Sequence, residues 1–570
     1  MGWRFIYTPL AADALYRSGY QRIAEDRYPE AEEAFNKATA MREFIAWYYR
    51  YADAYAAKRQ YFLAEGKYAS LIERHPHERA GILAWARLER DQLKYEEAVQ
   101  VLKGVPQPLA RVAPTEAARG KSGLLSWDYY NKDGLLLLGD VYLDWGDEDS
   151  AKFEDARRAY ATLIQHYGYS DLYLERMLLY FIRSDGALGP NGKARDNLSD
   201  ILALKQRFLA RKTNPLSSST MAELGGYLLD RNLLDDVLMI LLAAAKKAPA
   251  LPEAHYQLVR YFRRAGMQDE ERVALDNAVK TFAAQSGLTP RRTAMYLDSL
   301  IWRGDYRVAA REWIGAEQDF TTAATLYEQA LELRRVKKEA RFGEAYAGLA
   351  AVAFWQRDDL DSALSLLERA ADSGYDTADT RYERGYILYE KARFADSLEQ
   401  FYLAGKNGTE SPYLGFAFGT ALYERGDYFS AEAYFRRVAE AMNKELTQFN
   451  LFQPDQRPSQ AEILELLMKA DNNLGASLLR SAALVGDARR RGVAAASLSE
   501  SSHLHDELVA SGVPLGSDPR DLASQNLALA IKGANEPSPV VYTEIEKAMA
   551  FPRSGLAALA MNEERKSAGE

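Results

Sequence analysis

One stretch of the chain has the composition of a phosphate-binding loop, the segment from Gly186 to Lys193. Such a loop needs a glycine five positions before its final Gly-Lys pair, but that position is Ala187. It also needs a serine or threonine after the lysine to hold magnesium, and Ala194 stands there. No strand pattern precedes the segment. We therefore predict a plain loop between helices.

Metal and nucleophile chemistry is equally poorly supported. The chain has no cysteine, which excludes disulfides, zinc-thiolate sites and cysteine nucleophiles. His75 and His77 lie at a predicted helix end, and His503 and His505 are two positions apart in a predicted helix, so they point to different faces. No nucleophile elbow accompanies the serines. We predict no catalytic, cofactor or metal site, and hence no enzyme.

Charge and hydropathy exclude two further classes of partner. The formal net charge of −9 and pI near 5.5 argue against nucleic-acid binding, which normally needs a basic face. Short basic runs at 334–338 and 489–491 are interpreted as solvated helix ends. No segment approaches the roughly 20 apolar residues that span a bilayer. The longest candidate, 237–245, is a short amphipathic helix core, so no membrane insertion by this sequence is expected.

The organisation of the chain comes from an internal period of 34 residues. Small residues recur at Ala351, Gly385 and Gly419. A second small residue follows each of them 12 positions later: Ala363, Ser397 and Ala431. A bulky residue follows four positions after that: Leu367, Phe401 and Phe435. An apolar turn residue lies between the two small residues: Leu360, Phe394 and Tyr428. Small residues let two helices approach and bulky ones fill the space beside them.

The same pattern occurs in two other registers. One contains Gly19, Ala52 and Ala86, with Tyr28, Tyr61 and Tyr95 at the turn position; the other links Gly225 and Val259. A further unit opens at Gly139, but its second helix, with Tyr160, arrives five residues late. The periodicity predicts an all-α superhelical solenoid of α-α hairpin repeats with irregular insertions and an atypical helical C-terminal cap.

Breaks in the period predict the domain organisation. We expect an N-terminal repeat block over 1–103, a linker over 104–123, an irregular helical block over 124–215, a central repeat block over 216–449, and atypical repeats with capping helices over 460–570. Within the central block, Trp302–Tyr306 and Asp319-Phe320 look like two turn signatures that are too close for two standard units. A hairpin of another type, or a shortened helix, is expected there.

The concave surface of the solenoid is the remaining candidate site. Its inward positions lie one and four after the small mid-helix residue and three before it. Aromatic side chains at such positions bury a large area at small entropic cost and can anchor a peptide or helix. An alternative left open is that they only pack between neighbouring helices. The protein-binding candidates are Trp355, Tyr382, Tyr386, Tyr389, Phe416, Tyr423, Tyr16, Tyr20, Tyr49 and Asp53.

These registers resemble the tetratricopeptide-repeat (TPR) superfamily over most of residues 10–500. Tyr386 stands where the clamp that some TPR co-chaperones use for a C-terminal carboxylate needs an asparagine, which disfavours chaperone-tail binding. Within the superfamily, four sequence segments resemble the large TPR proteins of the spirochaete periplasmic flagellar collar: Ala222–Asp230, Leu251–Tyr256, Asn472–Gly475 and Ser524–Leu529.

The collar resemblance implies a non-enzymatic structural subunit around the flagellar motor that supports collar assembly, stator positioning and motility. Its implied partners are collar and stator subunits, and self-association is left open. The implied location is the periplasm, with an inner-membrane anchor. Because repeat sequence follows almost directly after Met1-Gly2, we expect an upstream segment. The alternative is a cytoplasmic TPR adaptor or peptide receptor that uses the same groove.

Overall fold

The computed structural model describes most of the chain as helices. The described residues are 2–76, 78–103, 132–189, 192–211, 214–285, 288–333, 336–407, 411–448, 460–513, 515, 520–532 and 539–543. The predicted linker at 104–123 lies outside them. Over the described residues the only β-type pairing is an isolated bridge between Leu188 and Ala194, in the loop that contains the glycine-rich stretch 186–193. Nor does any helix in this part of the chain combine the length and apolarity that crossing a membrane requires.

The chain divides into two compact units, Met1–Arg292 and Thr293–Glu570. The block predicted over 216–449 therefore contributes to both. The first unit contains α1 (Gly2–Ala24), α2 (Tyr28–Met41), α3 (Ile45–Ala57), α4 (Tyr61–Arg74), α5 (Arg79–Asp91), α6 (Tyr95–Lys103), α8 (Lys132–Gly146), α9 (Lys152–Tyr167), α10 (Asp171–Ser184), α11 (Leu198–Leu209), α12 (Ser218–Asp230), α13 (Val237–Lys247), α14 (Pro252–Ala265) and α15 (Gln268–Ala283).

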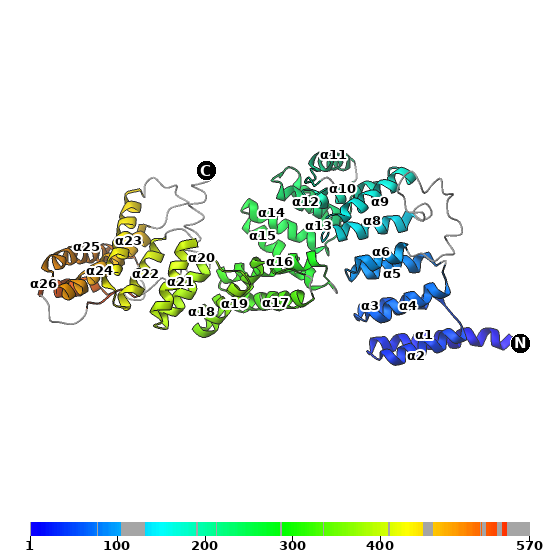
Figure 1. Ribbon diagram of the computed structural model, residues 1–570, viewed down its shortest axis with the longest axis horizontal. Coiled ribbons are helices and arrows are strands. Elements are labelled where there is room, and N and C mark those ends of the chain that lie inside the picture. The colour runs from blue at the N-terminus through cyan, green and yellow to red at the C-terminus, as the bar shows by residue number, and fades with distance from the viewer. Residues whose placement is uncertain are drawn as a thin grey trace. The chain divides into compact units, whose positions relative to one another are not determined.

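The second unit begins in the first turn of α16. Its helices are α16 (Pro290–Ala309), α17 (Trp313–Glu332), α18 (Glu344–Arg357), preceded by the short 3-10 helix η2 (Ala340–Gly343), then α19 (Leu360–Asp372), α20 (Ala378–Glu390), α21 (Phe394–Asn407), α22 (Pro412–Glu424), α23 (Tyr428–Gln448), α24 (Gln460–Val485), α25 (Ala488–Ala510) and α26 (Leu522–Lys532). Consecutive helices form hairpins (Figure 1), and we call the first helix of a hairpin A and the second B.

The hairpins have the packing that the 34-residue pattern predicts. A methyl group at Gly385 of α20 would lie 2.6 Å from the ring of Phe401 on α21, and one at Gly419 of α22 would lie 2.8 Å from Phe435 on α23. In these two hairpins the A and B helices therefore approach so closely that only glycine fits at the crossing, and the ring of helix B fills the seam. The all-α TPR-type solenoid predicted from the sequence is confirmed.

The predicted turn residues mark where the B helices begin. Each is the first residue of its helix: Tyr28 of α2, Tyr61 of α4, Tyr95 of α6, Leu360 of α19, Phe394 of α21 and Tyr428 of α23. Caps define several A helices. The Ser217 hydroxyl accepts a hydrogen bond from the Thr220 amide at the start of α12, and Thr377 and Thr380 form a capping box on α20.

The break around 290–340 differs from the expectation. The two apparent turn signatures lie inside α16 and α17, which are 20 residues each, so no helix there is shortened. Gly304 of α16 packs on Phe320 of α17, 16 positions later, which is the spacing between Gly385 and Phe401. The pair therefore marks one hairpin with longer helices. The phase of the repeat slips because those helices are long and residues 334–343 follow them.

Candidate polypeptide-binding surfaces

Six of the ten predicted groove residues lie in the hydrophobic core, where they fill the seams between helices. They are Tyr16, Tyr382, Tyr386, Tyr389, Phe416 and Tyr423. Tyr382 packs on Phe401, with ring centroids 5.5 Å apart, and Phe416 packs on Phe435 at the same separation. Burial also raises the pKa of the Tyr386 hydroxyl. In this structure these rings have the packing role that was the alternative interpretation, because the helices of neighbouring repeats cover them.

The other four candidates remain at least partly accessible. Tyr20 and Asp53 are exposed, and Trp355 and Tyr49 are half-buried. The Tyr49 hydroxyl donates to Glu78 at 2.9 Å, and Asp53 accepts from the Tyr68 hydroxyl at 3.2 Å. Tyr49 and Asp53 lie on α3 and both contact Tyr68, whose ring centroid is 6.2 Å from that of Tyr49, whereas Trp355 lies on α18 in the second unit. Their role in binding other proteins stays a prediction.

A chain of ion pairs runs across successive A helices of the first unit, and we call it the charge ladder. Arg90 of α5 pairs with Asp144 of α8 at 2.6 Å, and Asp144 pairs in turn with Arg183 of α10 at 2.7 Å. The Arg183 guanidinium grips Glu223 of α12 through two hydrogen bonds of 2.6 and 3.0 Å. Arg291, at the start of α16, reaches the second Glu223 oxygen at 3.0 Å.

The carboxylates of the charge ladder are paired with arginines of the same ladder. Burial acts to raise the pKa of Glu223, but the positive charges of Arg183 and Arg291 outweigh it and hold this pKa well below its usual range. Each main carboxylate of the ladder already has two cationic partners, so the arrangement links repeats to one another.

The second unit places a different polar set on its A helices. Asn472 and Asn473 lie on α24, Asn526 lies on α26, and all three side chains are fully buried. Their carboxamides contact one another: Asn526 donates to Asn472 at 2.9 Å, and Asn472 donates to Asn473 at 3.0 Å. A buried carboxamide needs partners for both its oxygen and its NH2 group. The remaining partners come from elsewhere in the chain.

Those partners are main-chain groups of residues 539–543, which we call the tail segment. The Val540 amide donates to Asn526 at 2.8 Å, and Asn526 donates back to the Val540 carbonyl at 2.6 Å. Asn473 forms the same reciprocal pair with Tyr542, at 2.8 and 2.9 Å. Asn472 also donates to the Val540 carbonyl, at 3.3 Å. Alternate residues pair on one side, as in an extended strand.

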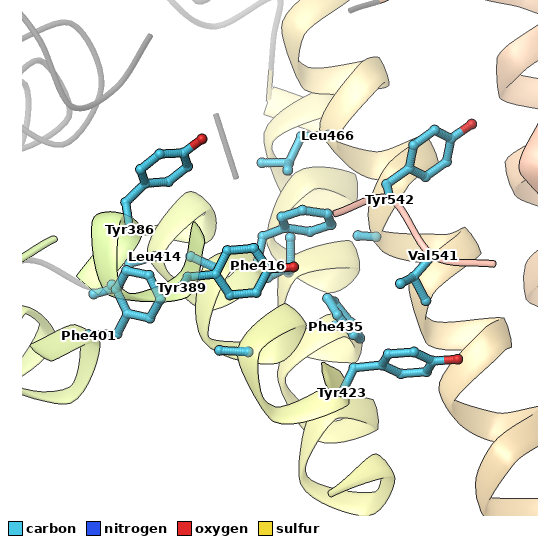
Figure 2. Close-up of a cluster of buried hydrophobic side chains, with 14 of the residues drawn as sticks. Tyr386, Tyr389, Phe401, Leu414, Phe416, Tyr423, Phe435, Leu466, Val541 and Tyr542 are labelled. Atoms are coloured by element: carbon cyan, nitrogen blue, oxygen red, sulfur yellow. The ribbon is translucent and has the colours of Figure 1, made fainter. Parts of the chain in front are cut away.

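Apolar contacts complete the site around the tail segment. Val541 and Tyr542 are buried in the same cluster as Phe416, Phe435 and Leu466 (Figure 2). The Tyr542 hydroxyl donates to the Arg520 carbonyl at 2.9 Å. We call this site, lined by α22, α24 and α26, the asparagine groove.

One predicted groove residue does touch the tail segment. The Tyr423 ring is buried, but its hydroxyl donates to the Pro539 carbonyl at 3.2 Å. Burial is also the main cause of the raised pKa of Tyr423. Tyr423 therefore both packs in the core and holds a polypeptide segment at its polar end.

Sequence reasoning missed the three asparagines as site residues. Their sequence segments, Asn472–Gly475 and Ser524–Leu529, served only as marks of resemblance. The rule for inward positions could have found one of them, because the position three before Gly475 is Asn472. No repeat pattern points to Asn526 or to the tail segment, since both lie beyond the last hairpin.

One group in the described residues has the composition of a cation site. His505 and Asp506 of α25 lie near Asp521. Asp521, however, accepts hydrogen bonds from the Ser524 amide at 2.9 Å and the Ser502 hydroxyl at 2.7 Å. These bonds cap α26 and fix it on α25. The carboxylate thus has a structural role, and we assign no metal to the group.

Comparison with known proteins gives little beyond these observations. No family model and no curated protein matches the chain. Among solved structures, the chain is similar to PilF of Pseudomonas aeruginosa (15% identity, TM-score 0.31, covering 39% of this chain and 91% of that chain). It is also similar to the APC/C hetero-tetramer Cut9–Hcn1 (16%, 0.30, 93% and 98%) and to yeast Tom70 (14%, 0.25, 91% and 95%). At TM-scores this low, the similarities support no statement about function.

Proposed function

We propose that the chain is a non-enzymatic scaffold that binds other polypeptides along its A-helix surfaces. The observation that carries this proposal is the asparagine groove, where side-chain carboxamides hold the main chain of a polypeptide segment at Val540 and Tyr542. Solenoids extend such surfaces over many repeats, because each hairpin needs only its neighbours for its core. Binding partners by repeated surfaces, without turnover, is the function that this geometry supports best.

Photo-crosslinking in cells tests the scaffold role. A photoreactive phenylalanine analogue would replace Trp355, the half-buried groove candidate on α18, or Tyr402, a 60% exposed ring on the B helix α21. Both positions are aromatic and lie in the second unit. We expect covalent adducts with a defined set of other polypeptides from position 355 and none from position 402. Equal capture at both positions, or none at either, would contradict the proposal.

A finer form of the proposal places the scaffold in the periplasmic collar of a spirochaete flagellar motor. It is supported by the resemblance of four sequence segments to the collar proteins. The lack of cysteine is compatible with an oxidising compartment. In this role the chain would support collar assembly and stator positioning, with an inner-membrane anchor. Cell fractionation tests the location, since recovery of the chain with cytoplasmic proteins would favour the adaptor alternative. Deletion of the gene should reduce swimming if the collar role is correct.

A further inference from the structure

The tail segment is held in the manner of a bound peptide. All four main-chain polar groups of Val540 and Tyr542 pair with asparagine carboxamides. A carboxamide offers one donor and one acceptor side by side, as a residue of a neighbouring strand does, so it can extend the pairing of a strand. Every residue except proline carries the same main-chain groups, and recognition of this kind therefore accepts many sequences.

The buried side chains of the segment add selectivity. Val541 and Tyr542 are buried, whereas Val540 is 41% exposed and Thr543 is exposed. The groove therefore fits an extended peptide with an aliphatic residue followed by a tyrosine whose hydroxyl reaches the Arg520 carbonyl. Proline is excluded at the positions of Val540 and Tyr542, because it lacks the N–H that donates to an asparagine.

We propose that the asparagine groove binds an extended peptide of this pattern from another protein, and that residues 539–543 are its internal competitor. The inference rests on the proposed polypeptide-binding function and adds its regulation. Because segment and groove belong to one chain, an external peptide competes against a high local concentration. Binding of a partner thus requires the tail segment to leave, and its release exposes Asn472, Asn473 and Asn526.

Proline substitutions in the full chain test the competition. Tyr542→Pro removes the amide that donates to Asn473, whereas Thr543→Pro makes the same change one residue later, at an exposed position outside the alternating pairs. The probe is a fluorescently labelled synthetic peptide with the sequence of residues 537–545. Fluorescence anisotropy measures its binding to the native chain, to each variant, and to Tyr542→Pro combined with Asn473→Ala.

We expect Tyr542→Pro to bind the probe at least about tenfold more tightly than the native chain, because the internal competitor is weakened. Thr543→Pro should bind like the native chain. Adding Asn473→Ala should remove the gain. The inference is wrong if folded Tyr542→Pro does not bind the probe, or if Asn473→Ala leaves binding unchanged. If the crosslinks from position 355 persist in that case, the inference fails while the proposed function stands.

A second measurement needs no variant and covers the case in which Tyr542→Pro does not fold. Amide hydrogen exchange of Val540 and Tyr542 in the native chain reports whether their hydrogen bonds to the groove open. Excess unlabelled probe peptide should accelerate exchange at both amides, because it displaces the tail segment. Unchanged protection at saturating peptide would mean that residues 539–543 are a fixed part of the C-terminal cap, and would overturn the inference.

Discussion

The A helices of the two units both carry clusters of polar side chains, half-buried in the first unit and fully buried in the second, and these find their partners in different ways. In the first unit the charge ladder runs Arg90, Asp144, Arg183, Glu223 and Arg291, and each ion pair joins residues of two different hairpins. In the second unit the asparagine groove completes its hydrogen bonds with main-chain groups of the tail segment, residues 539–543. The first arrangement links repeats, and the second holds a chain.

The chemistry of the two groups explains the difference. A buried charge is costly unless an opposite charge accompanies it, so a ladder of arginines and carboxylates must be closed within the fold. A neutral carboxamide carries no such demand, and water can satisfy it when the groove is empty. We expect the polar residues of the first unit to stiffen it, and the proposed peptide binding would use those of the second. The following predictions test each side of this comparison.

The largest loss of stability is expected from breaking the ladder at its most connected carboxylate. Glu223→Ala leaves Arg183 and Arg291 without their shared partner. Removing one member of a fully buried ion pair costs about 3–5 kcal/mol, and Glu223 is half-buried, so the free energy of unfolding measured in urea should fall by about 2–3 kcal/mol. Glu33→Ala is the control, because the Glu33–Lys37 pair is exposed on both sides and its loss should not be measurable. A loss at Glu223 no larger than at Glu33 would contradict the stiffening role.

We expect the stability of the fold to depend on pH through Asp471, which lies next to Asn472 on α24. Burial, with a smaller contribution from the charge of Glu500, raises the pKa of Asp471 to about 7. The folded state therefore binds this proton more tightly than the unfolded state does. The resulting stabilisation is fully present below the ordinary carboxyl pKa and is lost as the pH rises through 7.

Asp471→Asn should remove that pH dependence. One pKa unit corresponds to about 1.4 kcal/mol. At pH 8 the free energy of unfolding of the variant should therefore exceed that of the native chain by at most about 4 kcal/mol. At pH 4 the two should be nearly equal. Urea unfolding at both pH values checks this, with Asp506→Asn as control, because the Asp506 side chain is 81% exposed. Equal stability differences at both pH values would refute the assignment.

The hairpin seam is common to both units and should be equally sensitive to overpacking in each. Gly385→Leu forces a branched side chain against Phe401, and Gly139→Leu does the same against Tyr160. Overpacking of this kind costs about 1–3 kcal/mol, seen as a lower midpoint in thermal unfolding. Gly66→Ala is the matched control, because a methyl group there meets no atom within 4 Å and should not destabilise. A tolerated leucine at either seam would mean that the helices can move apart.

The repeat frame could be predicted from the sequence because packing restricts residue types there. A close helix crossing accepts only a small residue, as at Gly385, and the facing position needs a large one, as at Phe401. The same restriction places the first residue of each B helix. The long hairpin of α16 and α17 follows this rule through Gly304 and Phe320. The sequence predicted two turns there because both helices are longer than those of a standard 34-residue repeat.

The site could be predicted only in part. The rule for inward positions gives the direction of a side chain, but it does not say what the next repeat places against it. Tyr382 and Tyr386 therefore came out as groove candidates although neighbouring helices bury them. The contact between Asn473 and Tyr542 joins residues 69 positions apart, and Tyr542 lies beyond the last hairpin. No periodicity of the sequence predicts this contact. Polar pairing of this kind depends on tertiary geometry alone.

The most direct test of the comparison is to map where an extended peptide binds. A photoreactive version of the peptide of residues 537–545 would be crosslinked to the full Tyr542→Pro chain, and the adducts located by mass spectrometry. We predict adducts on α22, α24 and α26, which line the asparagine groove, and none on the helices of the charge ladder. Adducts on α5, α8, α10 or α12, or adducts spread evenly over both units, would contradict the account.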